Sequence, residues 1–254
     1  MPGPPAVEFL DDTEITFVEY PPPLLTSREE REVERIWRET RQRNPATFDG
    51  PIAAALGVDR SRSGPLVVRW APMTYRARAL RRLRPHHEVP GSLYVTVLLP
   101  TDNGLLLGRG APSTANPGYW TLPGGAVEPP PPGRGLDVAE LQRHAARELV
   151  EETGVRVPAE ELELWAVTRG ERYGSLGFHF ASPALSSALV RRRHAGVPVA
   201  ECEHDMGREL DELAFVASST EVAGLGPTAD YLPQILGRYF TADGSEEGHP
   251  SSRR

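Results

Sequence analysis

The chain has 254 residues, 39% hydrophobic and 25% charged, so it can build one large domain or one domain with an extension. Its net charge of −7 gives no electrostatic support for coating nucleic acid, so an anionic ligand needs local positive charge or metal ions. The one cysteine, Cys202, cannot form an internal disulfide, and no segment resembles a signal peptide or a membrane span. We therefore expect a cytoplasmic protein without a nucleic-acid or membrane partner.

Residues 1–90 predict an α+β extension ahead of the main domain. Residues 1–12 are rich in proline and acidic side chains, which predicts a loosely ordered start. Ser27 and Glu30 match a capping-box pattern, which favours a helix from there to about residue 43. β-branched, aromatic and apolar residues predict further strand-like segments at 15–20, 52–58, 66–70 and 75–80.

Arginines are dense in residues 76–84, and two interpretations are open. Arg76 and its neighbours either contact a phosphate or nucleotide, or they form an ordinary solvated surface. The chain contains arginine but no lysine, which fits GC-rich coding better than selection for one chemistry. We favour the solvated surface and keep Arg76 as a candidate substrate contact.

Residues 91–240 predict the main domain, an α/β unit. Residues 93–99 form a near-continuous apolar run, which is typical of a strand buried on both faces. Residues 102–104 (Asp-Asn-Gly) are a hairpin signal, and residues 105–109 return as the partner strand. The later pattern predicts strands at 162–169, 176–181 and 213–217, a loop at 183–200, a closing helix at 228–240 and a disordered tail at 241–254.

Three glutamates share one arc of a predicted central helix. On a helix that advances about 100° per residue, Glu148 and Glu152 lie about 40° apart, and Glu151 lies about 60° to the other side of Glu148. Like charges one turn apart repel, so a solvated face gains nothing from this pattern. A divalent cation would remove the conflict, and hard oxygen ligands suit Mg²⁺ or Mn²⁺.

The same helix shows where these carboxylates face. An apolar stripe lies beside the glutamates and places them at the rim of the buried face: Val138, Leu141, Ala145 and Leu149. Asp137 is a suitable N-cap, and Gly154 is a suitable glycine just past the end. Upstream, Trp120 begins a strand that runs into Gly124 and Gly125, whose backbone groups can approach an ion or a phosphate.

The alternative for residues 148–152 is an ordinary solvent-exposed helix end without a ligand, because most clusters of charged residues on helices are solvated. Acidic residues at a helix C-terminus oppose the helix dipole, however. We therefore favour a metal site.

These residues resemble the Nudix box, the signature of hydrolases that act on a nucleoside diphosphate linked to another moiety. The second half of that motif is matched by Arg147, Glu148, Leu149, Glu151, Glu152, Gly154 and Val155. The first half differs, because Gly125 precedes Arg147 by 22 positions (147 − 125), about eight more than in the family pattern. The insertion falls in the Pro/Gly-rich residues 129–135, and Ala139 stands where the family has a glutamate.

The resemblance implies an α/β/α sandwich with a mixed central sheet, the box helix on one face and the final helix on the other. Residues 1–90 would form either a lobe over the substrate cleft or a homodimer contact. The helix, turn and strand order around residues 48–50 (Phe-Asp-Gly) also loosely resembles the N-terminal extension of Nudix enzymes that hydrolyse UDP-sugars.

The resemblance also implies a metal and catalytic set. Mg²⁺ or Mn²⁺ would bind Glu148, Glu151, Glu152 and Gly125. The catalytic group would be Glu151 and Glu152, with Arg147 orienting them by ion pairing.

Further candidates lie outside the box. Arg109 follows the partner strand, where the family often has a phosphate-facing arginine, and a surface charge is the alternative; with Arg76 and Trp120 it makes up the candidate substrate contacts. The additional acid or base is sought among Glu209, Glu212 and Glu128.

The implied substrate is a small nucleoside diphosphate derivative. We favour a nucleotide sugar of the UDP type, which would give a nucleoside monophosphate and a sugar phosphate. ADP-ribose, a CMP-linked metabolite and a (d)NTP stay open. The second class is a Nudix-like module that senses a nucleotide sugar without hydrolysing it. Such modules usually lose box glutamates, and here all three are present, so we favour the enzyme.

Overall fold

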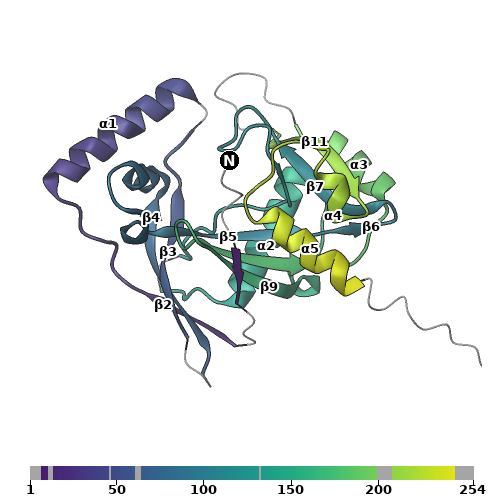
Figure 1. Ribbon diagram of the computed structural model, residues 1–254, viewed down its shortest axis with the longest axis horizontal. Helices are drawn as coiled ribbons and strands as arrows, with labels where there is room; N and C mark the ends of the chain where they lie inside the picture. The colour runs from purple at the N-terminus through teal and green to yellow at the C-terminus, as the bar shows by residue number, and fades with distance from the viewer. Residues whose placement is uncertain are drawn as a thin grey trace, which may run out of the picture.

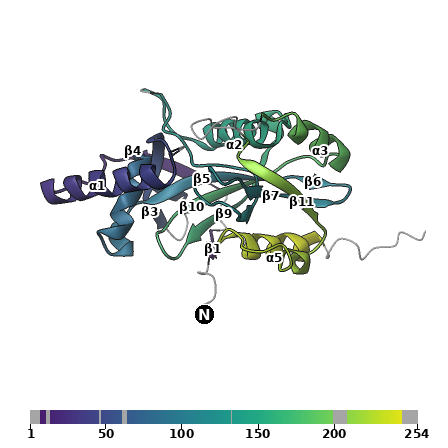
Figure 2. The same cartoon turned by 90° about the horizontal axis from the view of Figure 1, so that it is seen from above.

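The computed structural model describes residues 7–10, 14–45, 47–60, 64–131, 133–198 and 208–243. In this part of the chain a mixed β-sheet lies between layers of helices (Figures 1 and 2). Figure 2 shows α2 (Val138–Thr153) and α3 (Ser187–Ala195) over one face and α5 (Leu232–Asp243) over the other. The expected α/β/α sandwich is therefore confirmed.

The remaining elements complete the layers. The other helices are α1 (Ser27–Arg43), α4 (Ser219–Val222) and the 3₁₀ helices η1 (Tyr75–Arg82), η2 (His86–Glu88) and η3 (Ala159–Glu161). The strands are β1 (Val7–Phe9), β2 (Ile15–Glu19), β3 (Pro51–Arg60), β4 (Leu66–Thr74), β5 (Gly91–Leu98), β6 (Pro100–Thr101), β7 (Gly104–Gly110), β8 (Trp120–Thr121), β9 (Glu163–Gly170), β10 (Leu176–Ala181) and β11 (Leu210–Val216).

The larger sheet runs in the order β1-β9-β10-β5-β3-β4-β2, and the smaller one in the order β11-β7-β6, with β8 beside β7. The pairs β10–β5 and β2–β4 are parallel, and their neighbours in the sheet are antiparallel. Within the described residues, no helix is both long enough and apolar enough to cross a membrane.

β5 has both faces buried, as its apolar run predicts. Leu93, Val95 and Val97 belong to the core cluster that also contains the apolar stripe of α2. Leu98 belongs to the second cluster, which packs under α5. Because alternate residues of a strand point to opposite faces, this one segment supports both layers of helices.

Strands from the first 90 residues continue the main sheet. β3 pairs with β5 through Ala54↔Ser92 and Ala55↔Gly91, and β1 pairs with β9 at the opposite edge. Figure 1 shows α1 and β2–β4 together at one side of the molecule. The proposed boundary near residue 90 therefore falls inside a continuous sheet, and it stays a prediction.

Several local expectations were wrong. Thr26, rather than Ser27, caps α1, and its partner is Glu29, so the capping box lies one residue earlier than expected. Residues 75–80 form η1 instead of a strand, because this places the adjacent Ala79 and Leu80 together against α1.

The predicted loop at 183–200 contains α3, whose Val190 and His194, four residues apart, are both buried. β1 lies within the expected loose start. β11 begins at Leu210 and α5 at Leu232, so both starts were misplaced. Residues 1–6, 11–12 and 244–254 of the expected loose ends lie outside the described residues.

His179 on β10 is fully buried between the two layers. Thr96 Oγ1 lies 2.7 Å from its Nδ1 and Thr168 Oγ1 lies 2.8 Å from its Nε2, so both ring nitrogens are satisfied. Burial lowers the pKa of this imidazole to about 3. His179 is therefore a neutral part of the core.

Replacing His179 by glutamine should make the protein less sensitive to acid. The pKa of histidine is 6.5 when it is not perturbed, and that of His179 is about 3 in the folded protein. Below pH 6.5 the unfolded state therefore binds a proton at His179 that the folded state does not bind. Wild type then loses stability as pH falls, by about 2 kcal/mol between pH 7 and pH 5. Urea unfolding should show that the difference in free energy of unfolding between pH 7 and pH 5 is smaller by that amount in the variant. Equal differences in both proteins would contradict this account.

Candidate active site

α2 carries the candidate site on its C-terminal half. Asp137 Oδ1 caps its start by accepting a hydrogen bond from Glu140 N at 2.6 Å, and Gly154 ends it with a φ of 69°. The expected stripe is buried, with Leu141, Ala145 and Leu149 all 0% exposed. The helix is thus held at both ends and along one face, which fixes the directions of its glutamates.

Glu152 is the buried carboxylate of the site. Its side chain is 5% exposed, and its Oε2 accepts a hydrogen bond from Gly124 N at 2.7 Å. Burial, and after it the nearby Glu148 carboxylate, raise the pKa of Glu152 well above the usual value, and the Gly124 hydrogen bond opposes this only in part. The residue is thus poised to gain from a nearby cation.

The glycine turn before α2 is bound to β5 and needs glycine twice. Val97 N donates to Pro123 O at 2.8 Å, and Val95 N donates to Gly125 O at 3.0 Å. A Cβ atom on Gly124, which has a φ of 149°, would lie 2.1 Å from Val95 O. A Cβ atom on Gly125 would lie 2.5 Å from Glu148 Oε2. The turn therefore forms a cradle in which the Glu148 carboxylate rests against backbone.

His144 connects the turn to the glutamates, and the sequence analysis missed it. It is 5% exposed; its Nε2 lies 2.9 Å from Ala126 O and 3.0 Å from Glu148 Oε1. Arg147 donates to its Nδ1. Because arginine can only donate, Nε2 carries the proton that Ala126 O and Glu148 share. The available signal was its position one turn before Glu148.

Arg147 lies beside the same carboxylates. Its Nη2 is 3.9 Å from Glu128 Oε2. Burial and then Glu148 raise the pKa of Glu151, and the charge of Arg147 opposes this only in part. Glu128 is more than half exposed and sits across the turn from α2. The structure thus brings Arg147 and Glu128 to the rim of the site.

Glu209, just before β11, and Glu212, within it, have different surroundings. Burial, then Glu148 and Glu151, raise the pKa of Glu209, so its carboxyl lies within electrostatic reach of α2. Glu212 instead pairs with Arg109, at 2.9 Å between Oε2 and Nη2, and Asp211 Oδ1 lies 3.2 Å from Arg109 Nε. Arg109 and Glu212 thus neutralise each other on the sheet surface.

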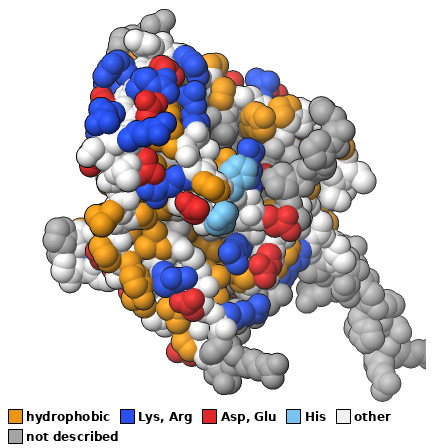
Figure 3. Space-filling view, turned by 60° about the vertical axis from the view of Figure 1, so that its left-hand side comes forward, with side chains coloured by type: hydrophobic (Ala, Val, Ile, Leu, Met, Phe, Trp, Pro, Cys, Tyr) orange, Lys and Arg blue, Asp and Glu red, His pale blue; other side chains and the backbone are white. Residues whose placement is uncertain are grey.

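Two further substrate candidates lie elsewhere. Arg76 pairs with Asp49 (Nε to Oδ2, 3.2 Å) and Glu34 on the extension, and Figure 3 shows that the arginines of this face are interspersed with acidic side chains. This supports the solvated-surface interpretation. Trp120 is 4% exposed and donates from Nε1 to Leu225 O at 2.9 Å, so its ring belongs to the core.

The donor set at the turn fits a hard divalent cation. Burial and the nearby charge of Glu148 raise the pKa of three carboxyl groups at the turn: Glu151, Glu152 and Glu209. As the side chains stand, no three His, Cys, Asp or Glu residues of the described chain converge tightly enough to bind one ion. Glu148 is held by His144 and Glu152 by Gly124. The chemistry of the set therefore fits a metal, and the exposed Glu151 side chain is the one with room to turn.

Comparisons with known proteins agree with the motif. The family model described as NUDIX domain matches residues 92–220. No curated protein matches the chain by sequence.

Several solved structures are similar to this chain. The MutT protein of Methanosarcina mazei Go1 is 23% identical over 63% of this chain and 99% of its own, with a TM-score of 0.42. A NUDIX hydrolase from Nitrosomonas europaea is 22% identical over 64% of this chain and 76% of its own, with a TM-score of 0.40. A bifunctional NMN adenylyltransferase/ADP ribose pyrophosphatase from Francisella tularensis, complexed with AMP and a Mn ion, is 15% identical over 65% and 45%, with a TM-score of 0.43.

Glu152→Gln should stabilise the metal-free protein at neutral pH. The pKa of Glu152 is raised in the folded protein. Below pH 4.5 the carboxyl is protonated in both states and costs no stability, and as pH rises above 4.5 the wild type loses stability. Glutamine keeps an acceptor for Gly124 N and carries no charge. Thermal unfolding in EDTA at pH 7.5 should show a free energy of unfolding that is higher in the variant than in wild type by on the order of 1 kcal/mol or more. This difference should vanish near pH 4. A destabilised variant at pH 7.5 would show that the buried charge is compensated.

Gly125→Ala should weaken metal binding with little loss of stability. The new methyl group meets the end of a flexible side chain, Glu148, which can move at small cost but only by leaving the cradle. We expect Mn²⁺ affinity, measured by calorimetry, to fall roughly tenfold. Gly135→Ala is the control, because a Cβ atom there meets no atom within 4 Å. Equal affinities in the two variants would remove the cradle from the metal site.

Proposed function

The chain belongs to the Nudix hydrolase family, enzymes that hydrolyse pyrophosphate linkages, and we propose that its substrate is a nucleoside diphosphate linked to another moiety. The observation that supports this most directly is the Glu152 carboxylate, buried against the amide of Gly124 beside three other acidic side chains. A buried carboxylate without a positively charged partner lowers the stability of a core, and it becomes favourable when it faces a cation that binds a diphosphate.

The residues that would hold the cation are Glu148, Glu151 and Glu152 on α2, with the Gly125 carbonyl on the facing turn. Mg²⁺ or Mn²⁺ suits this all-oxygen set. When bound, the cation neutralises charge on the diphosphate and makes a neighbouring water more acidic. His144 keeps Glu148 aligned with the turn, and Arg147 balances the charge of Glu151.

Glu209 is our candidate for the general base. Its raised pKa brings it closer to the range in which a carboxylate accepts a proton efficiently, and it faces Glu148 and Glu151. In the proposed step water attacks one phosphorus, the bond from that phosphorus to the bridging oxygen breaks, and the water's proton passes to Glu209. The products are a nucleoside monophosphate and the phosphorylated remainder.

A nucleotide sugar of the UDP type is our first candidate substrate. Its support is the order of α1, the turn at residues 44–50 and β3, which matches the helix, turn and strand expected from the resemblance of the extension. ADP-ribose, CMP-linked compounds and (d)NTPs are the competing substrates in the test.

The direct test incubates purified full-length protein with Mg²⁺ or Mn²⁺ and a panel of UDP-sugars, ADP-ribose, CMP-linked compounds and dNTPs. Release of UMP and sugar phosphate at the highest kcat/KM supports the proposal in full. Preference for another member of the panel would keep the reaction and reject the nucleotide sugar. A panel member that raises the melting temperature without being hydrolysed would instead favour a binding module.

Glu209→Gln should lower kcat on the best substrate by about a hundredfold or more, because it removes the proton acceptor. Glu212→Gln is the matched control three residues further along the chain, and its ion pair with Arg109 predicts a change within a few fold. Steady-state kinetics at saturating Mg²⁺ separates the two. Similar losses in both variants would place the base elsewhere.

A further inference from the structure

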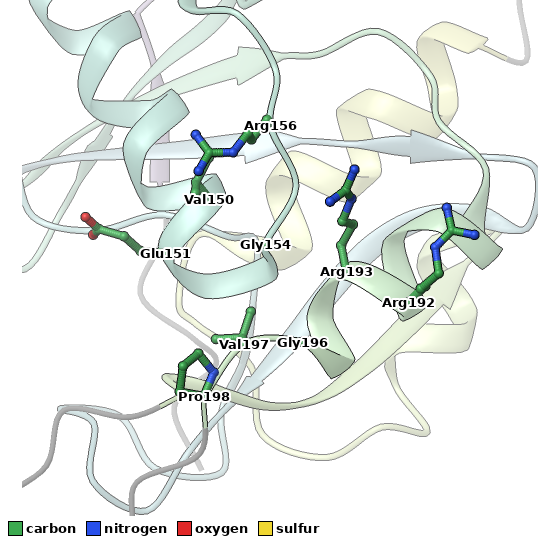
Figure 4. Close-up of a pocket in the computed structure, with 9 residues that line it drawn as sticks. All are labelled: Val150, Glu151, Gly154, Arg156, Arg192, Arg193, Gly196, Val197 and Pro198. Atoms are coloured by element: carbon green, nitrogen blue, oxygen red, sulfur yellow. The ribbon is translucent and has the colours of Figure 1, made fainter.

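A cavity of about 720 Å³ lies between the C-terminal ends of α2 and α3, next to the candidate active site (Figure 4). Three of its lining residues are arginines from two different segments. Arg156 follows the end of α2, and Arg192 and Arg193 belong to the last turn of α3. Positive charge is thus concentrated in a hollow of a protein whose net charge is −7.

These guanidinium groups have no partner of opposite charge in the described chain. None of them forms a side-chain hydrogen bond or ion pair with a residue in the described ranges. By contrast, Arg147 at the neighbouring site and Arg109 on the sheet surface each face at least one carboxylate. Arginines that share a cavity without pairing with a carboxylate repel one another, and an anion between them would relieve this repulsion.

Glu151 also lines the cavity but leaves its positive charge uncancelled. Figure 4 shows its carboxylate turned away from α3, on the side of α2 opposite Arg193. The charges that influence Glu151 most are those of Glu148 and Arg147, both on the active-site side. One end of the cavity therefore opens next to the metal-binding glutamates, and the other is cationic.

The position of Arg193 is fixed by close packing. A Cβ atom on Gly154 would lie 2.7 Å from Arg193 O, so the end of α2 touches the backbone of α3 there. On the other side, His194 Nε2 lies 2.7 Å from Leu210 O, which ties the same turn of α3 to β11. The backbone at Arg193 is thus held on both sides, and the guanidinium groups that line the cavity are exposed.

We propose that the α2–α3 cavity binds a phosphate group through Arg156 and Arg193, with Arg192 adding charge at its outer edge. Phosphate suits the site because its oxygens accept paired hydrogen bonds from the planar forks of guanidinium groups. The phosphate is either a phosphoryl group of the substrate that projects past Glu151, or free inorganic phosphate.

The test titrates full-length protein with inorganic phosphate in EDTA at constant ionic strength, by calorimetry. In EDTA the acidic active site repels phosphate, so the heat reports on the cavity. Wild type should bind saturably. Arg156→Gln and Arg193→Gln should each weaken binding roughly tenfold or more, the loss expected for one charged hydrogen-bond donor. Arg193→Lys should keep an intermediate affinity.

Arg191→Gln is the matched control on the same helix. Its guanidinium lies over the Phe215 ring, 4.6 Å from the ring centroid and outside the cavity lining, so phosphate affinity should not change. Circular dichroism and melting temperature check that every variant is folded.

Absence of saturable binding by wild type, or equal affinity in wild type and the Arg156→Gln/Arg193→Gln double variant, overturns the proposal. A triple variant, Glu201→Gln, Glu203→Gln and Asp205→Asn, removes the acidic side chains that follow Pro198 in the sequence. Phosphate binding by that variant but not by wild type would show that the chain itself neutralises the arginines. That result would also overturn the proposal. If binding is confirmed, phosphate inhibition that is competitive with substrate identifies a substrate phosphoryl group, and noncompetitive inhibition identifies free phosphate.

Discussion

The hydrogen bond between Gly124 N and the buried Glu152 carboxylate sets the requirements that the surrounding structure meets. A carboxylate with so little exposure is unfavourable unless a fixed donor faces it. The donor is fixed because the glycine turn is hydrogen-bonded to β5, and β5 is fixed because both of its faces lie in the core. The acceptor is fixed because α2 is capped at its start, ended by a glycine and packed along its stripe.

Much of this could be predicted from the sequence because the signals are local. The stripe of α2, its Asp137 cap and its Gly154 end depend on residues within a few turns of each other, and all were confirmed. Contacts between distant strands carry no such signal. The pairing of Arg109 with Glu212 depends on the register of β7 against β11, so the sequence could not separate Glu212 from Glu209.

His144 and α3 illustrate two other limits. A buried histidine on an amphipathic helix is usually an ordinary core residue, and only the coordinates show that it contacts Ala126, Arg147 and Glu148 together. Only three positions of α3 are buried, Ser187, Val190 and His194, and two of these are polar. Its periodicity was therefore too weak to distinguish it from a loop, and the cavity beside it was not foreseen.

The pairing of β1 with β9 has a consequence for how the chain is made. Val7 lies opposite Gly170, so β1 finds its neighbour only after the residues between them have been synthesised. β3 faces a similar but shorter delay, because its partner β5 follows within the next forty or so residues. Contacts this distant along the chain slow folding. Until β9 has been made, β1 lacks the strand that covers its edge in the folded protein, and an uncovered strand edge can pair with another chain.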